Sequence, residues 1–323
     1  MSPRLSQARY TRRPWLFVLL LLGAALSLRA QSPTQSVDRA DLFRTPGTFG
    51  DNVYDPITGT DSGHAAASPN DPDLGEQEIL KRQERYRAFT ATVAAPMFYT
   101  SNVALARTDE RGDFIFAPAV GISYAPHITQ TLYGAFSVGQ QQFYYNRYGE
   151  FDFGSFDFRA GLNYSLPTLH DLQLHAEYNF NRLTASHDLG DEFFTDHSLF
   201  LSAELPFRIG RAQQVAIGAE TNISLYAEEA APRRHDFDVY VGYSANLTRS
   251  LSVNAVGRVA VRDYVEGDRD DVSEILALSA TYRFTKWLSA SASSTLAANQ
   301  SNHSVFDYQV ANFGGAVAVS LRF

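Results

Sequence analysis

Hydrophobic and polar residues alternate with a period of two along most of the chain after residue 88. The clearest case is the C-terminus, where one set of alternating positions is mostly apolar and the other is small or polar. The first set is Phe313, Gly315, Val317, Val319, Leu321 and Phe323, and the second is Asn312, Gly314, Ala316, Ala318, Ser320 and Arg322. Successive side chains of a β-strand point to opposite faces, so this pattern predicts strands with one apolar and one polar face.

We place candidate strands by this alternation and by the turn residues that separate them. Most run for about 10–14 residues, which is longer than most globular strands and close to the ~9–11 residues of a tilted bilayer crossing. Their number is about twelve, and an even number is typical of bacterial outer-membrane barrels. The candidate strands are residues 89–99, 114–124, 131–143, 151–164, 172–183, 198–207, 213–226, 237–246, 251–264, 275–284, 288–298 and 308–323.

The connections alternate between short turns and mostly longer, more acidic loops, although the connection NRYGE is brief. Short turns on one rim and long loops on the other are the layout of outer-membrane barrels. The sequence therefore predicts an all-β, antiparallel, up-and-down transmembrane barrel with both termini in the periplasm. Aromatic residues beside the short turns would form part of a girdle at the membrane interface: Tyr124, Tyr164, Tyr243, Tyr282 and Phe284.

A β-propeller is a competing interpretation, because the short turns recur about every 40 residues, as propeller blades do. A blade of that length holds four short strands, whereas only two long strands fit between successive turns here. No Trp-Asp or Gly-His signature occurs at the blade positions. The barrel is therefore favoured over a propeller or another soluble β-fold.

The N-terminal part of the chain has a different character. In residues 1–30, four arginines precede an apolar run and the small residue Ala30, as in a secretory signal peptide. The run of about 14 residues is shorter than the ~20 of a spanning helix, so a retained membrane anchor is the weaker alternative. Residues 88–323 are assigned to the barrel.

The intervening residues, 31–87, are predicted to be a mostly disordered periplasmic leader. Up to about residue 80 they are rich in Ser, Pro, Gly, Asp and Asn and show neither a helical nor a strand period. A short helix over residues 76–89 (EQEILKRQERYRAF) would join the leader to the first strand. The alternative is a plug that folds into the barrel.

Composition narrows the classes of function. The chain has no cysteine, which excludes a lipoprotein anchor and a disulfide framework. Cleavage after Ala30 would remove five of the 27 basic residues and none of the 35 acidic ones, leaving a charge of about −13. Such a charge argues against nucleic acid as a partner.

Two segments resemble known proteins. The terminal strand GGAVAVSLRF resembles the C-terminal recognition strand of Gram-negative outer-membrane proteins. This resemblance implies recognition of Val319, Leu321 and Phe323 by the barrel assembly machinery, and contact with outer-membrane lipid and lipopolysaccharide. The segment FYTSNVALARTDERGDFIFAPAVGISY looks like the opening of uncharacterised porin-like barrels, which have a Tyr-x-Ser-Asn loop, and it implies a porin-like protein without a known substrate.

If the apolar face meets lipid, the opposite face lines the lumen. We predict a porin-like channel for small hydrophilic solutes or saccharides, without a cofactor. The alternative is a closed structural or surface-interaction barrel, in which lumen charges pair between adjacent strands and acidic loops contact external partners. A barrel of about twelve strands lies between filled and open examples, so both remain open. The predicted pore-lining residues are Asp157, Arg159, His175, Glu177, Glu204, Glu220, Arg258, Arg262, Arg283 and Arg322.

Catalytic and metal sites find little support in the sequence. His197 lies next to Asp196 and Ser198, but adjacent strand residues point to opposite faces, so neither pair would form a hydrolase site. His175 with a serine of a neighbouring strand remains the one candidate, and we expect no enzyme. The loop EGDRDD, residues 266–271, lacks the spacing of a calcium loop and is interpreted as solvated. No zinc cluster or phosphate loop is present, so no metal is expected.

Overall fold

The computed structural model describes residues 33–43, 54–55, 60–61, 87–185, 191–210 and 212–323. The predicted signal peptide and most of the predicted leader lie outside these residues. The helix α2 (Pro33–Phe43) and a pairing of β1 (Tyr54–Asp55) with β2 (Thr60–Asp61) precede the main sheet. Among the described helices, none is long and apolar enough to cross a membrane.

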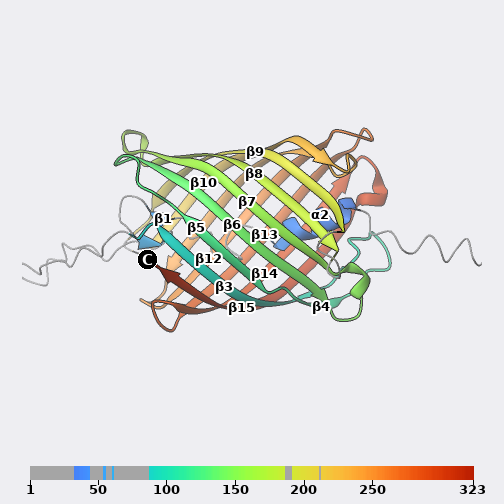
Figure 1. Cartoon of the computed structure of the whole chain (residues 1–323), viewed down its shortest axis with the longest axis horizontal. Helices are drawn as coiled ribbons and strands as arrows, with labels where there is room; N and C mark the ends of the chain where they lie inside the picture. Colours follow the sequence, from blue (N-terminus) through green and yellow to red (C-terminus); the bar gives the residue numbers. More distant parts are fainter. Residues whose placement is uncertain (1–32, 44–53, 56–59, 62–86, 186–190, 211) are drawn as a thin grey trace, which may run out of the picture. The chain divides into compact units, whose positions relative to one another are not determined.

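The main sheet is antiparallel and closes on itself (Figure 1). Strands adjacent in sequence pair with each other, and the last strand pairs with the first, so no strand of this sheet has an unpaired edge. β4 and β5 together form one crossing, and the barrel has 12 crossings. The strands are β3 (Phe89–Thr100), β4 (Asp113–Phe116), β5 (Ala119–Tyr124), β6 (Leu132–Tyr145), β7 (Phe153–Leu166), β8 (Leu172–Ala185), β9 (Glu192–Arg208), β10 (Gln213–Glu228), β11 (Arg234–Asn246), β12 (Leu251–Tyr264), β13 (Asp270–Arg283), β14 (Leu288–Ser301) and β15 (Tyr308–Arg322).

The structure confirms the predicted closed barrel and corrects several strand limits. β9 begins at Glu192 rather than residue 198, β11 at Arg234 rather than 237, and β13 at Asp270 rather than 275. The added segments contain acidic and basic residues, which interrupt the apolar alternation used to place the strands. These polar stretches nevertheless pair with their neighbours in register, Arg262 lying opposite Asp236 and Asp271.

The predicted strand over residues 114–124 is interrupted at Ala117 and Pro118. Proline has no backbone N–H to donate to a sheet. The ladder continues around it, because Ala117 N donates to Pro96 O at 2.9 Å and Gln142 N donates to Pro118 O at 3.0 Å. β4 and β5 therefore act as two halves of one crossing.

The outer face of the barrel is apolar and exposed. Val93, Met97 and Val239 are 57%, 62% and 60% exposed, and each alternates along its strand with inward residues. A soluble sheet protein would bury such side chains, whereas a barrel in a bilayer turns them to lipid. The predicted girdle residues are likewise exposed: Tyr124, Tyr164, Tyr243, Tyr282 and Phe284.

The two ends of the barrel differ in their connections. We call the end with residues 125–131, 167–171, 209–210, 247–250 and 284–287 the turn end, and the end with residues 101–112, 146–152, 229–233, 265–269 and 302–307 the loop end. Three turns share one device: the hydroxyls of Thr129, Thr248 and Thr285 each accept hydrogen bonds from backbone N–H groups two and three residues later. The barrel also closes at the turn end, where the backbones of Phe89 and Phe323 exchange two hydrogen bonds.

Candidate functional site: the barrel interior

All ten residues predicted to line the lumen lie on the inward face of the sheet. Each alternates along its strand with exposed apolar side chains, and residues opposite one another in an antiparallel pair share a face. Their role in lining a pore stays a prediction, while their contacts divide them into groups along the wall.

The first group lies on β7 and β8. Nη1 of Arg159 is 3.8 Å and Nε2 of His175 is 3.0 Å from the carboxylate of Glu177. The other ring nitrogen of His175 is hydrogen-bonded to Asn163. Gly161 lies opposite Glu177, and a Cβ at that position would be 2.3 Å from Glu177 Cβ, so the glycine makes room for the carboxylate side chain. His175 is therefore engaged by an acid and an amide.

The second group lies on β9 to β12. Nη1 of Arg258 is 3.4 Å from Glu220 Oε1 and 3.8 Å from Asp238 Oδ2, so one guanidinium contacts two acids from neighbouring strands. The hydroxyl of Tyr240 donates to Glu204 Oε2 at 2.7 Å. Charges of opposite sign are thus paired around this part of the wall.

The remaining predicted residues are Asp157, Arg262, Arg283 and Arg322. Asp157 accepts a hydrogen bond from Asn181 Nδ2 at 2.9 Å. Arg283 and Arg322 are half-buried on the last turn-end positions of β13 and β15. Arg262 differs from these three residues, because it is buried and forms an ion pair with Asp38 of α2.

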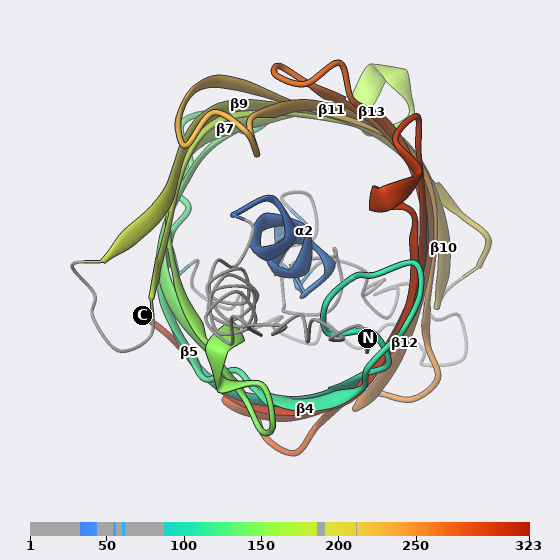
Figure 2. The same ribbon diagram turned by 90° about the vertical axis from the view of Figure 1, so that its right-hand side faces the viewer.

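Helix α2 lies inside the ring of strands (Figure 2) and is held by buried arginines of the wall. Asp38 forms an ion pair with Arg234 at the start of β11. Oδ1 of Asp38 is also 3.3 Å from Nη1 of Arg262 on β12. Its Oδ2 is 3.9 Å from Nη2 of Arg269 in the loop that follows β12. Asp41 forms a second ion pair with Arg234. Three wall arginines, which we call the arginine cluster, therefore converge on one carboxylate.

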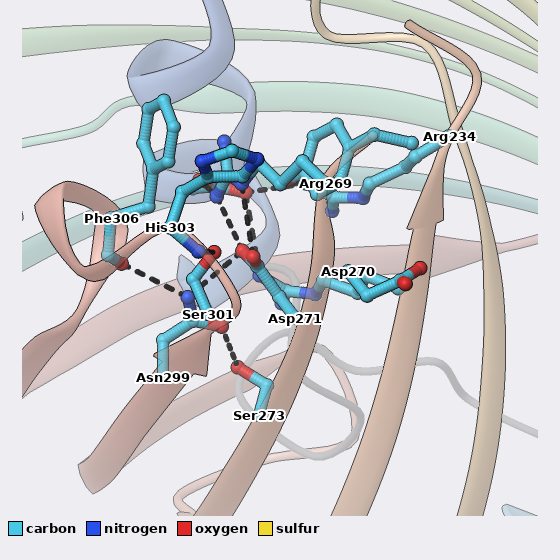
Figure 3. A network of polar contacts seen from close by, with 12 residues as sticks. Arg234, Arg269, Asp270, Asp271, Ser273, Asn299, Ser301, His303 and Phe306 are labelled. Carbon is cyan, nitrogen blue, oxygen red and sulfur yellow. Dashed lines mark hydrogen bonds and ion pairs between the residues drawn. The ribbon is translucent and has the colours of Figure 1, made fainter. Parts of the chain in front are cut away.

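A polar network supports the arginine cluster from the wall (Figure 3). Asp271 on β13 is fully buried and pairs with Arg269, whose Nε donates to it at 2.9 Å. Asn299 on β14 donates to Asp271 at 2.9 Å and accepts from the Ser273 hydroxyl at 3.0 Å. The guanidinium of Arg269 also lies 3.7 Å from the centroid of the Phe306 ring. The side chain of Arg269 is therefore fixed on several sides.

A fourth arginine, Arg39, belongs to α2 itself and points to a different part of the wall. Its Nη1 donates to the carbonyl of Val103 at 3.1 Å and its Nη2 to Ser36 Oγ at 2.8 Å. It also lies 4.6 Å from the centroid of the Phe151 ring. Burial lowers the pKa of Arg39, but a guanidinium stays protonated at neutral pH. Arg39 therefore anchors the helix as a cation.

Apolar side chains pack on two sides of α2. Ala40 belongs to a cluster with inward aromatic and aliphatic residues of β3 to β9, and Val37 packs against this cluster. Leu42 belongs to a second cluster, with residues of β13 to β15 and of the loop 101–112. The first cluster comprises Ala40, Phe98, Val103, Ile115, Ala117, Phe143, Tyr145, Phe153, Leu183 and Phe194, and the second Leu42, Leu105, Ile275, Ala297, Tyr308 and Val310. The loop-end half of the interior is thus filled.

The turn-end half is lined differently. Its inward residues are mostly small or polar and half-buried, whereas the inward residues of the same strands near the loop end are buried. β14 shows the change, with Ser289, Ser291 and Ser293 half-buried and Thr295, Ala297 and Asn299 buried. The inward side chains at the turn end are therefore partly accessible to solvent.

Most of the arginine cluster is not evident from the sequence. Arg234 falls between predicted strands, and residues 266–271 are predicted to be a solvated acidic loop. That interpretation is wrong for Arg269 and Asp271, which are 5% and 0% exposed and paired. Asp38 and Asp41 lay in the predicted leader, where no helical period was found. One signal was present, because Pro33 after a serine is typical of the first position of a helix.

The described residues contain no group of three or more His, Asp or Glu side chains that could hold a metal ion. His197 and Ser198 lie on opposite faces, as expected: the His197 ring contacts Tyr178, Phe180 and Tyr226, and Ser198 is buried on the inward side. The expectation that the protein is not an enzyme stays a prediction.

Comparison with solved structures addresses the fold. The outer-membrane channel COG4313 of Pseudomonas putida F1 matches with a TM-score of 0.54 and 11% identity, over 73% of this chain and 96% of that chain. The fold is that of an outer-membrane β-barrel. Two further structures match with lower TM-scores. The translocator domain of the autotransporter NalP from Neisseria meningitidis has a TM-score of 0.45 and 12% identity, over 75% of this chain and 90% of that chain. The KdgM porin has a TM-score of 0.38 and 7% identity, over 71% of this chain and 99% of that chain. No family model and no curated protein sequence matches this chain.

The three residues singled out by the C-terminal resemblance lie on one face. Leu321 on β15 and Phe323 just after it are exposed, and Val319, half-buried, lies on the same outward face of β15. Their recognition by the barrel assembly machinery stays a prediction.

Proposed function

We propose that this barrel is an outer-membrane channel for small hydrophilic solutes, including saccharides, with its turn end in the periplasm and its loop end outside the cell. The observation that carries the proposal is the polar, partly solvent-accessible interior of the turn-end half. A polar inner face behind an apolar outer band is what a solvated path through a bilayer requires. No cofactor is needed for passive diffusion.

The loop-end half limits this path. α2 and the side chains packed around it occupy the interior there, so the conducting state requires that α2 moves or leaves a narrow passage beside it. The lumen charges near it are paired within the wall and with the helix. These pairs favour the second candidate, a closed barrel whose loops contact external partners.

Single-channel conductance separates the two candidates. Mature protein, residues 31–323, would be refolded into a planar bilayer beside a variant with Asp38→Asn and Asp41→Asn. These substitutions remove both α2 carboxylates that pair with the arginine cluster, so we expect the variant to be open for a larger fraction of time than the wild type. Asp109→Asn is the matched control, because Asp109 pairs with Arg111 in an exposed loop.

Ion selectivity then reports whether the inward face borders the path. Glu177→Gln removes a negative charge and Arg258→Gln a positive one, so the two should shift the reversal potential in a salt gradient in opposite directions. Silence of both the wild type and the double variant would contradict the channel and favour the closed barrel, provided that heat-shifted gel mobility shows folded protein.

A further inference from the structure

The arginine cluster is built like a binding site for a carboxylate. Arg234, Arg262 and Arg269 come from β11, β12 and the loop between β12 and β13, and each is no more than 6% exposed. All three reach the carboxylate of Asp38, which belongs to a helix about 200 residues earlier in the chain. Planar guanidinium groups with several fixed donors suit a carboxylate better than a lysine would.

Acids of both the wall and the helix contact this positive charge. Nε of Arg234 lies 2.8 Å from Asp236, and Arg269 pairs with Asp271. Arg262 forms an ion pair with Asp38 of α2. The helix therefore contributes carboxylates to the cluster beside those of the wall.

Two of the three arginines also have partners outside α2. Arg269 is stacked between two rings, 4.0 Å from the centroid of Tyr264 and 3.7 Å from that of Phe306. Nη1 of Arg234 donates to the Tyr264 hydroxyl at 3.2 Å. Because these contacts involve only the wall and its loops, they would orient Arg234 and Arg269 toward an anion that replaces Asp38.

We propose that the arginine cluster is a binding site for small solutes that carry carboxylates, and that Asp38 of α2 occupies it in this structure. The proposal rests on the proposed channel, which gives solutes access to the interior. Asp38 and Asp41 are three residues apart on one helix, about 5–6 Å between Cβ atoms, and both pair with Arg234. The site therefore suits a dicarboxylate.

The tethered helix competes with a free solute. A group held on the same chain acts at an effective concentration in the millimolar range. Wild-type protein therefore binds a dicarboxylate weakly, and loss of the α2 carboxylates exposes the site. Binding of the solute and docking of α2 exclude each other.

Calorimetric titration with sodium succinate at constant ionic strength tests this site without any need for conduction. The protein is the refolded mature chain in detergent micelles. We expect the Asp38→Asn, Asp41→Asn variant to bind succinate more tightly than the wild type. Adding Arg262→Gln to this variant should weaken succinate binding by about tenfold or more. Adding Arg111→Gln, which removes one positive charge from an exposed loop, should leave it unchanged.

The result that would overturn the proposal is succinate binding that is absent in the double variant, or binding that survives Arg262→Gln. If Arg262→Gln does not fold, Arg262→Lys keeps the charge, removes the two-pronged donor, and should still weaken binding. Because calorimetry reads binding and conductance reads passage, a silent bilayer with succinate binding would reject the channel alone. An open channel without binding would reject this site alone.

Discussion

The two halves of the barrel interior are built by the same strands but are filled differently. On β13, the inward residues Asp271, Ser273, Ile275 and Ala277 near the loop end are buried, whereas Ser279, Thr281 and Arg283 toward the turn end are half-buried. β3 changes in the same way, from Phe98 and Thr100 at the loop end to Thr90 and Thr92 at the turn end. The alternation that makes a strand is therefore shared, and the packing of α2 against the inward side chains distinguishes the loop-end half.

The loop-end half needs α2 for its packing. Its aromatic and aliphatic residues would line a cavity without Ala40 and Leu42, and its arginines would lack Asp38. The turn-end half has inward residues that are mostly small or polar and half-buried. The barrel interior thus combines a packed core at one end with partly accessible inward residues at the other, and substitutions in the two halves should differ in their effects.

The largest difference should come from the aromatic core. Phe153 is fully buried on β7 and stacks on Phe143 with 4.3 Å between ring centroids. Phe153→Ala leaves a cavity and should lower the free energy of unfolding by about 3–5 kcal/mol. Ser291→Ala, at an inward half-buried position of β14, should change it by less than about 0.5 kcal/mol. Urea titration followed by the fluorescence of Trp287 measures both, and equal effects would contradict a packed loop-end half.

A smaller difference should come from buried ion pairs. Asp271→Asn removes the charge that pairs with Arg269, and a hydrogen bond to a charged group contributes about 1.5–3 kcal/mol. In the other half, Glu177→Gln weakens a 3.8 Å contact with Arg159, which is about a third exposed, while the new amide can still hydrogen-bond to His175, so the loss should be about 1 kcal/mol or less. The same titration compares them. A larger loss for Glu177→Gln than for Asp271→Asn would show that the ion pairs of the turn-end half, rather than those around α2, dominate stability.

The sequence predicted the barrel because lipid imposes a local rule on it. Most outward positions in the membrane band are apolar, so the two-residue period is visible within a single strand, as in β15 from Phe313 to Leu321. The same rule placed all ten candidate interior residues on the correct face. The alternation of apolar and polar positions is weakest at the loop end, where β9, β11 and β13 begin with acidic and basic residues beyond the apolar band.

The contents of the barrel could not be predicted in this way. The pairing of Asp38 with Arg234 and Arg262 joins residues far apart in the chain, and a single charged residue has no local period that reveals its partner. The segment EGDRDD is predicted to be solvated because nothing within it indicates that the ring of Phe306 covers Arg269 or that Asn299 donates to Asp271. Only the tertiary arrangement identifies these residues as one cluster.

Chemical labelling gives the most direct comparison of the two halves. The chain has no cysteine, so a single introduced thiol reports its own surroundings. Ser291→Cys lies half-buried toward the turn end of β14, and Ser273→Cys is fully buried on the neighbouring strand β13 near the loop end. Both positions face the interior, and cysteine is similar in size to the serine that it replaces. A water-soluble maleimide should label Ser291→Cys rapidly and Ser273→Cys slowly, because reaction requires access to the thiolate.

Removing the α2 carboxylates tests whether the helix controls this labelling. If α2 and its ion pairs keep water from the loop-end half, then Asp38→Asn with Asp41→Asn should speed the labelling of Ser273→Cys and leave Ser291→Cys unchanged. Asp109→Asn, which removes one charge from an exposed loop, should alter neither rate. Equal labelling of both cysteines in the wild type would mean that the interior is uniformly open. Slow labelling of Ser273→Cys in every variant would mean that the wall network of Asp271 and Asn299, rather than the helix, excludes water there.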